Sequence, residues 1–477
     1  MKYLVFPVLV FIRASVCSIG LLVFCPNISA QIVTYPISPG QITSPDFTMT
    51  VNDNNVPVQK LGPDPVTNEK ARAQRANILG GEMDSVNIAN FSCKGVLTIV
   101  ITACEPIEAF LIRPKSKGIN GKVHGNQLTF TMSGSGKLQI EINKLANLAI
   151  FANPLEVNPP KRDDPKVVYF EQGMHILGQI DLESNQTIYI AGGAVVKANV
   201  RGSNLRNVKI IGRGILQGNV KISGTTNLLV DGIIVNCTGK SWINTLTGCH
   251  HSAYRNVKVF GYTVPWSTDG INPVGCSYFS IDDCYLRTGD DCIAVKCKDY
   301  GMRVDSITVT NCIMAGWMCN DGFTIGFELN GSTVENILVK NCDILRSRKG
   351  RGPTGGHACF SIVCDGPARI SNIRFEDIRC EEDIEYNNFD LIVTHGSYYG
   401  DDPPGHINGV YLKNISWEKA DAPFRILGYS SDNVVENVTF DNCTVGGTPL
   451  RSEDDAKFEI NSYTKNIKFI YKNLTNQ

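Results

Sequence analysis

The sequence predicts an all-β protein in which an N-terminal antiparallel β-sandwich precedes a right-handed parallel β-helix. From about residue 166, a short motif of alternating apolar residues returns at intervals of roughly 20 to 37 residues. Little helical periodicity lies between the copies, which is typical of a strand-only solenoid. Before about residue 160, the chain shows short alternating runs separated by turn residues, as in strands joined by hairpins.

Residues 1–30 have the features of an export signal. Lys2 supplies a positive charge, an apolar stretch runs to about Cys25, and Ile28-Ser-Ala30 offers a small-residue cleavage site. An uncleaved anchor is less favoured because the uninterrupted apolar part is short for a membrane span. No later stretch is long and apolar enough to cross a bilayer. We therefore expect a secreted or periplasmic protein whose mature chain has no membrane span.

Charge and cysteine content limit the classes of partner and of covalent cross-link. The net charge is −1 and no basic block occurs, so nucleic acid is not expected as a partner. Seventeen cysteines in an exported chain would ordinarily indicate disulfides. Four of them recur at one position of the repeat and predict instead an inward-facing ladder of small apolar residues: Cys284, Cys312, Cys342 and Cys443.

The first domain is expected over residues 31–160. Its candidate strands alternate apolar and polar residues: Phe47–Val51, Val96–Thr102, Gln127–Met132 and Lys137–Ile142. No acid cluster, histidine cluster or metal-spaced group occurs there, so a packing or carbohydrate-contacting module is expected. The prolines at 154, 159 and 160 and the charged stretch 161–165 indicate a linker to the next domain.

The second domain is expected over residues 166–477, where the repeat accounts for the chain. Copies of the motif begin at Asn207, Asn227, Asn256, Tyr278, Ser306, Asn336, Asn372, Gly409, Asn437 and Asn466. Leucine-rich repeats would need regular leucines and an intervening helix, and propeller blades would need about four strands in a longer period. A parallel β-helix, in which each coil stacks on the next, fits the pattern better.

Three carboxylates stand out in the solenoid: Asp269, Asp290 and Asp291. Asp269 lies twelve residues after a strand anchor at Val257, and Asp291 lies twelve residues after one at Phe279. Equal phase on neighbouring coils predicts that these two carboxylates stack one above the other. Asp290 and Asp291 would point to opposite faces of a regular strand. Both reach one cleft only if the chain bends, and we expect Gly289 to allow that bend.

Further polar and aromatic residues recur near the same phase. Asp321 arrives one coil later and Glu328 follows it. Trp266 and Trp317 enter their coils at similar places, and Trp242 lies near that phase one coil before Trp266. Aromatic faces beside acids suit sugar rings, although ordinary packing explains each tryptophan equally well. The candidate substrate contacts are Asp321, Glu328, Trp266, Trp317 and Lys296. His357, His395 and the charged residues of 346–351 could also line a cleft, but structural or solvated roles are more common.

The residues alone leave three interpretations of the acid cluster open. Three carboxylates could bind Ca²⁺, which prefers oxygen ligands. They could hydrolyse a glycosidic bond, one acid protonating the leaving oxygen while a carboxylate activates water. They could also belong to ordinary Asp-Gly turns.

Three motifs resemble the signatures of glycoside hydrolase family 28, the polygalacturonase family: Ser267-Thr-Asp-Gly270, Gly289-Asp-Asp-Cys-Ile-Ala-Val-Lys296 and Thr324-Ile-Gly-Phe-Glu328. The order of sandwich and solenoid is also similar to the dextranases of family 49. The resemblance implies hydrolysis by single displacement with inversion. Asp290 would be the general acid, and Asp269 and Asp291 would position water. No metal or cofactor is implied.

The sequence departs from that family at two motifs. Asn320-Asp-Gly322 stands where the family has Gly-His-Gly, and Ser361-Ile-Val363 stands where it has Arg-Ile-Lys. Arginine and lysine are natural partners of a uronate carboxylate, and this chain lacks both there. We expect an exported glycoside hydrolase acting on a plant or algal polysaccharide. A Ca²⁺-dependent polysaccharide lyase and a non-catalytic glycan-binding protein are the alternatives.

Overall fold

The computed structural model describes residues 30–63, 84–239, 242–262, 267–316, 321–347, 358–384, 387–395 and 403–471. Strands dominate these residues, with two short 3₁₀ turns, η1 (Lys115–Lys117) and η2 (Glu453–Asp455), as the helical elements. In the part of the chain so described, no helix has the length and hydrophobicity needed to cross a membrane. The all-β prediction is confirmed. The predicted export signal lies outside the described residues, apart from Ala30.

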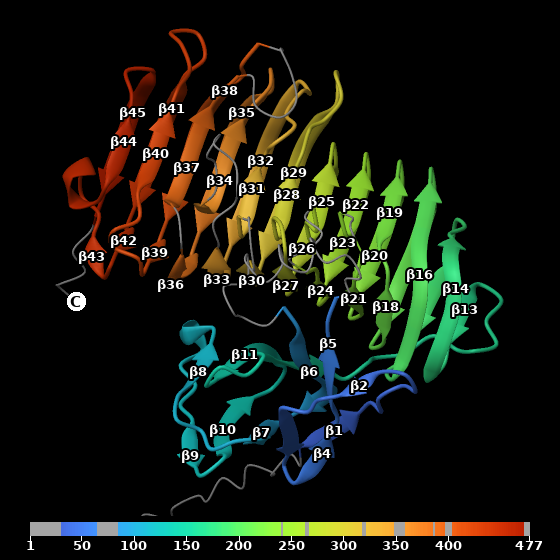
Figure 1. Ribbon diagram of the computed structural model, residues 1–477. Coiled ribbons are helices and arrows are strands. Elements are labelled where there is room, and N and C mark those ends of the chain that lie inside the picture. Colours follow the sequence, from blue (N-terminus) through green and yellow to red (C-terminus); the bar gives the residue numbers. More distant parts are fainter. Residues whose placement is uncertain are drawn as a thin grey trace, which may run out of the picture.

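Two sheets face each other in the N-terminal region (Figure 1). The first contains β1 (Gln31–Thr34), β2 (Ile42–Thr43), β5 (Val58–Leu61), β6 (Val86–Lys94), β8 (Phe110–Arg113), β11 (Gly136–Ile142) and β12 (Leu148–Pro154). The second contains β3 (Phe47–Val51), β4 (Asn54–Val56), β7 (Val96–Ala103), β9 (Lys122–His124) and β10 (Gln127–Ser133). All pairs are antiparallel except β6 with β12, which can pair in parallel because the chain between them, strands β7 to β11, is long enough to cross over.

The second region winds into coils that each supply up to three strands, stacked in parallel on those of the next coil. The long sheet is formed by β13 (Val167–Phe170), β15 (Thr187–Ile190), β17 (Arg206–Gly212), β20 (Thr226–Asp231), β23 (His250–Arg255), β26 (Ser277–Asp282), β29 (Arg303–Thr310), β32 (Thr333–Lys340), β35 (Arg369–Glu376), β38 (His406–Lys413), β41 (Val435–Asp441) and β45 (Thr464–Ile470). This stacking confirms the right-handed parallel β-helix.

Two further ladders share their first strands, β14 (Gly173–Asp181) and β16 (Ala194–Ser203), and separate after β16. The docking ladder contains β18 (Ile215–Gln217), β21 (Ile234–Asn236), β24 (Lys258–Phe260), β27 (Tyr285–Thr288), β30 (Ile313–Gly316), β33 (Asp343–Ser347), β36 (Arg379–Ile384), β39 (Ser416–Trp417) and β42 (Thr444–Val445), with β43 (Thr448–Pro449) added antiparallel. The site ladder contains β19 (Val220–Ser223), β22 (Asn244–Thr247), β25 (Ile271–Val274), β28 (Ile293–Val295), β31 (Phe323–Ile325), β34 (Ala358–Cys364), β37 (Asn387–Val393), β40 (Phe424–Leu427) and β44 (Phe458–Ile460).

Asparagines at left-handed corners help to stack the coils. Asn311, Asn341 and Asn442 have φ values between 52° and 56°, a region that asparagine tolerates better than most residues. Their amides bond side-chain oxygens of the coil before: Asn341 donates to Asn311 at 2.7 Å and Asn442 donates to Asn414 at 2.8 Å. The sharp turn between strands is therefore tied to its neighbour at each of these coils.

The four cysteines of the predicted ladder lie inside the solenoid. Thr310 pairs with Asp282 and with Lys340, so Cys284, Cys312 and Cys342 follow at equivalent positions on three coils. These three thiols and Cys443 are at most 1% exposed, and every cysteine in the described ranges is a free thiol. Small apolar side chains fit the narrow interior, which explains why the repeat places cysteine there.

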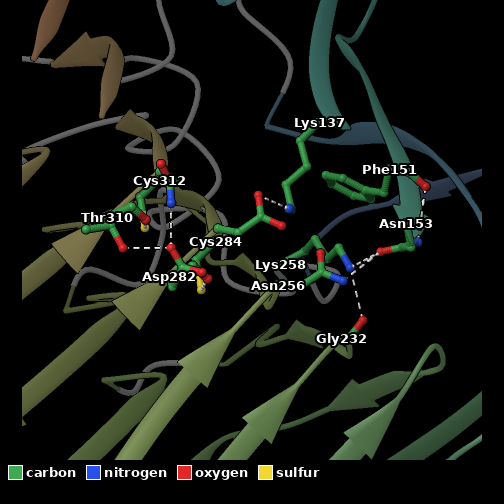
Figure 2. Close-up of polar contacts among 12 residues, drawn as sticks. Lys137, Phe151, Asn153, Gly232, Asn256, Lys258, Asp282, Cys284, Thr310 and Cys312 are labelled. Carbon is green, nitrogen blue, oxygen red and sulfur yellow. Dashed lines mark hydrogen bonds and ion pairs between the residues drawn. The ribbon is translucent and has the colours of Figure 1, made fainter. Parts of the chain in front are cut away.

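The sandwich packs against the flank of the solenoid formed by the docking ladder (Figure 1). One buried cluster joins the two regions, with Ile88 and Phe151 of the sandwich among Phe260, Tyr285 and other residues of the solenoid. Polar contacts cross the same interface. Lys258 of β24 donates to Asn153 of β12 and to the carbonyl of Gly232 (Figure 2). The domain boundaries at residues 160 and 166 stay predictions.

Candidate active site

The pairing register of the site ladder aligns four residues in one column, one on each coil. Asn244 pairs with Ile271, Ile271 with Ile293, and Ile293 with Phe323. The residues two positions before these strand partners are Trp242, Asp269, Asp291 and Asp321. Asp269 and Asp291 therefore occupy equivalent places on neighbouring coils, as the sequence predicted.

The strand anchors from which we predicted this alignment, Val257 and Phe279, are not equivalent. Phe279 pairs with Ser252, and Lys258 pairs with Tyr285, so Val257 corresponds to Cys284 and not to Phe279. The segment from Phe260 to Ile271, which leads to Asp269, is longer than the equivalent segment from Arg287 to Ile293 on the next coil. Ten residues lie between Phe260 and Ile271, and five lie between Arg287 and Ile293, which offsets the wrong choice of anchors.

Asp290 lies in a tight turn between β27 and β28. The hydroxyl of Thr288 donates to the backbone carbonyl of Asp290 at 2.6 Å. The Asp290 carboxylate accepts the backbone N–H groups of Asp291 and Ser267, both at 3.0 Å. Asp290 is half-buried, whereas Asp269 and Asp291 are only 3% and 5% exposed. Of these three acids, Asp290 is therefore the one with most access to a ligand.

Gly289 is required at this turn because the neighbouring coil approaches it closely. A β-carbon at position 289 would lie 2.2 Å from the carbonyl oxygen of Tyr262 and 2.7 Å from the hydroxyl of Thr268. Its N–H donates to that hydroxyl at 3.2 Å. Its φ lies outside the left-handed region, so the need for glycine is space and not the bend that the sequence suggested.

Burial and mutual repulsion change the proton affinities of the acids. Burial raises the pKa of Asp290 well above its ordinary value, and the nearby charges of Asp269 and Asp291 raise it further. Burial also raises the pKa of Asp269, but the Lys296 ammonium opposes that effect, and the pKa is about 6. The surroundings of Asp269 and Asp290 therefore shift the two pKa values differently. Such a difference is the usual basis of paired acid and base roles.

Lys296 and Asn272 contact Asp269 directly. The amide of Asn272 donates to Asp269 Oδ2 at 2.8 Å, and Lys296 Nζ lies 3.7 Å from the same oxygen. Lys296 Nζ also lies 3.1 Å from Glu328 Oε2 and 4.6 Å from the centre of the Trp242 ring. Sequence reasoning missed Asn272, although its place three residues after Asp269 was a possible signal.

Asp321 is bonded within the protein. Its carboxylate accepts the backbone N–H of Ala358 at 2.7 Å and the hydroxyl of Ser361. Ser361 and Val363, which stand at the arginine and lysine positions of the resembled motif, are 0% and 1% exposed. The departures noted in the sequence thus form a buried Asp–Ser pair.

The candidate substrate contacts stay predictions, and the structure shows the surroundings of three of them. Asp321, Glu328 and Lys296 are 1%, 2% and 5% exposed and are bonded to protein groups, so the structure places them behind the surface. Trp266 and Trp317 lie outside the described residues, as do His357, Asn320 and the loop positions 348–351. His395 contacts the ring of Tyr429 at 6.0 Å. Within the described ranges, no group of three or more His, Cys, Asp or Glu side chains is arranged to hold a metal ion.

Comparison with known proteins relates this geometry to solved and curated proteins. The fold is similar to Dex49A from Penicillium minioluteum, with a TM-score of 0.59 at 14% identity over 91% of this chain and 96% of that one. A curated relative, exopolygalacturonase clone GBGE184 of Arabidopsis thaliana, is 24% identical over 68% of this chain and 67% of its own length.

A second relative, endopolygalacturonase B of Aspergillus oryzae, is 26% identical over 32% of this chain and 38% of its own length. The chain thus spans well under two thirds of several of the curated relatives it matches. Residues 181–422, about half of the chain, match the family described as Glycosyl hydrolases family 28. They include all three aspartates of the acid cluster. The chain therefore belongs to glycosyl hydrolase family 28.

Proposed function

We propose that the chain hydrolyses O-glycosidic bonds of a plant or algal polysaccharide related to pectin, by single displacement with inversion. The observation that carries the proposal is the environment of Asp290. Burial and the charges of Asp269 and Asp291 raise the pKa of its carboxyl well above the ordinary value. A carboxyl whose pKa is raised holds its proton to higher pH and can protonate the leaving oxygen. Asp290 is also the half-buried member of the cluster, so it has access to a bound glycan.

Asp269 and Asp291 supply the other half of the reaction in this proposal. Their equivalent places on neighbouring coils present two carboxylates side by side, and a water held between them would be activated for attack on the anomeric carbon. The pKa of Asp269 is about 6, and burial with two neighbouring acids raises the pKa of Asp290 well above its ordinary value. The rate should therefore fall as the pH drops through about 6, and again where Asp290 ionises.

Family membership supports hydrolysis over the lyase and the binding protein that the residues alone left open. The names of the curated relatives, an endopolygalacturonase and an exopolygalacturonase, support a pectic substrate. Ser361 and Val363 offer no cation at the motif that would grip a uronate. Ser361 pairs with Asp390, and Asp390 pairs with Arg425, so Arg425 lies two coils after Ser361 in the site ladder. Its guanidinium makes a bidentate pair with the Asp390 carboxylate, at 2.9 and 2.5 Å. The identity of the sugar that would bind beside Ser361 and Val363 therefore belongs to the proposal.

We also propose that the protein is exported and that residues 1–30 are removed. The charged residue, apolar run and small-residue site near Ala30 support this. N-terminal sequencing of the mature protein should start at Gln31. A mature chain that retains Met1 would contradict it.

The proposed hydrolysis is tested by release of reducing ends from polygalacturonate, rhamnogalacturonan, dextran and red-algal galactan, with a chelator present. We expect release from at least one of the first two. An unsaturated product that forms only without chelator would indicate the lyase. Binding of these glycans without any release would indicate the binding protein, and either outcome would overturn the proposal.

A further inference from the structure

Lys296 is held rigidly at the centre of the acid cluster. Its backbone N–H donates to the carbonyl of Pro273 at 3.0 Å, and its own carbonyl accepts the N–H of Gly275 at 2.9 Å. The side chain is 6% exposed. The preceding coil thus fixes the backbone from which the Lys296 side chain extends.

The ammonium contacts one side chain from each of three other coils. It lies 4.6 Å from the centre of the Trp242 ring, 3.7 Å from Asp269 Oδ2 and 3.1 Å from Glu328 Oε2. Glu328 is shared with a second cation, because Lys298 Nζ lies 3.8 Å from its other oxygen. The Lys296 ammonium therefore interacts with two carboxylates: Asp269, which takes part in the proposed reaction, and Glu328, which does not.

Glu328 is itself fixed in place by the following coil. The backbone N–H groups of Glu328 and Leu329 both donate to the Asp365 carboxylate at 3.0 Å. Glu328 has a left-handed φ of 68°, a conformation that costs energy for a residue with a side chain. The next coil therefore holds the Glu328 loop in this conformation and the carboxylate within reach of Lys296.

The charges around Lys296 keep it protonated. Burial alone would lower the pKa of its ammonium, but Asp269, Glu328 and Asp291 together raise that pKa above the ordinary value. Its effect on the two acids is unequal. Lys296 is the largest influence opposing the rise in the pKa of Asp269, and it is the smallest of the main influences on Asp290.

We propose that Lys296 is a positioning residue that keeps Asp269 ionised while Asp290 retains its proton, and that Glu328 sets how strongly it does so. The inference rests on the proposed hydrolytic function and replaces the expectation that Lys296 and Glu328 contact the substrate. Lys296 acts on the reaction through Asp269. Glu328 competes with Asp269 for the ammonium, so loss of Lys296 and loss of Glu328 have opposite consequences for the proton affinity of Asp269.

The test titrates the Asp269 carboxyl by pH-difference infrared spectroscopy, with the band assigned by its absence in Asp269→Asn. In Lys296→Met, the midpoint should move up by about one pH unit or more, since an opposite charge at this range shifts a pKa by about 1 to 3 units. In Glu328→Gln the midpoint should move down, and in Lys296→Arg it should stay near that of the wild type. Circular dichroism checks that each variant is folded.

The pH profile of kcat/KM on a glycan that the wild type cleaves gives a second readout. Its acidic limb should follow the infrared midpoint in each variant. Lowered rates with unmoved midpoints in both Lys296→Met and Glu328→Gln would show a merely structural role and overturn the inference. If Lys296→Met does not fold, the direction of the Glu328→Gln shift decides. A wild type that cleaves no glycan would sink the proposed function, while the infrared titration would still test Lys296.

Discussion

Asp269 and Asp291 occupy the same position on two neighbouring coils, because Ile271 pairs with Ile293 in parallel register. The backbone confirms the relationship, since the N–H of Gly270 donates to the carbonyl of Asp291 at 2.8 Å. Stacking of like charges costs free energy and raises the pKa of nearby carboxyls. Here it raises the proton affinity of Asp290, which lies in the turn beside them.

The stereochemistry of the product follows from the proposed single displacement. Water held by Asp269 and Asp291 would attack the face of the sugar opposite the leaving group, so the new reducing end should have the inverted anomeric configuration. Proton NMR of the first product, recorded before mutarotation, measures this. Retention of configuration would mean that one of the carboxylates is a nucleophile.

The raised pKa of Asp269 predicts a pH dependence of stability. The folded protein holds this proton up to about pH 6, whereas the unfolded chain releases it near the ordinary value of 3.8. Stability from this group is therefore complete below about pH 4 and is lost as the pH rises through about 6. Asp269→Asn should raise the free energy of unfolding at pH 7 by on the order of 1 to 3 kcal/mol.

The comparison that checks this is urea unfolding of both proteins at pH 4 and pH 7. The gain of Asp269→Asn should be much smaller at pH 4, where the wild-type carboxyl is already neutral. An equal gain at both pH values would show that the effect has another cause.

The buried pair of Asp321 and Ser361 should matter for stability. Ser361→Ala removes a hydroxyl donor from a carboxylate that is 1% exposed, and an unsatisfied buried group costs about 1 to 3 kcal/mol. Ser361→Thr, which keeps the hydroxyl, is the matched control, with the added methyl group as its own cost. A Ser361→Ala variant as stable as the wild type in urea unfolding would mean that other donors compensate.

The contact between sandwich and solenoid should depend on one buried ion pair more than on its exposed neighbour. Arg113 of β8 pairs with Glu381 of β36, at 6% and 3% side-chain exposure. Arg113→Met leaves a buried charge uncompensated, and such losses cost about 3 to 5 kcal/mol. Lys115→Met disrupts the exposed pair with Glu418, for which a loss below about 1 kcal/mol is expected. Equal unfolding midpoints for the two variants would contradict this account.

Much of the fold was predictable because each coil repeats the same local physics. The alternation in Ser306–Cys312, for example, places Ile307 and Val309 inside at 0% exposure and ends on the buried Cys312. Asn311 marks the corner by its left-handed φ. The same pattern in other coils gave the solenoid, its cysteine ladder and the grouping of the acids.

The details of the site were harder to predict because they depend on contacts between coils of unequal length. The choice of Val257 as the counterpart of Phe279 was wrong because Val257 follows strand β23, whereas Phe279 lies within β26 and pairs with Ser252. Lys296 and Glu328 are 32 residues apart in sequence, and their ion pair depends on the Asp365 contacts one coil further. Sequence spacing does not report such side-chain partners.

The most direct test of the central claim is kcat/KM of wild type and Asp290→Asn on the glycan from the panel that the wild type cleaves best. The account predicts a loss of about 10²- to 10⁴-fold, because Asn cannot donate the proton to the leaving oxygen. The fold should be retained, and Asp299→Asn, an exposed acid in the loop after β28, should keep full activity. Turnover by Asp290→Asn at the wild-type rate would show that Asp290 is not the acid.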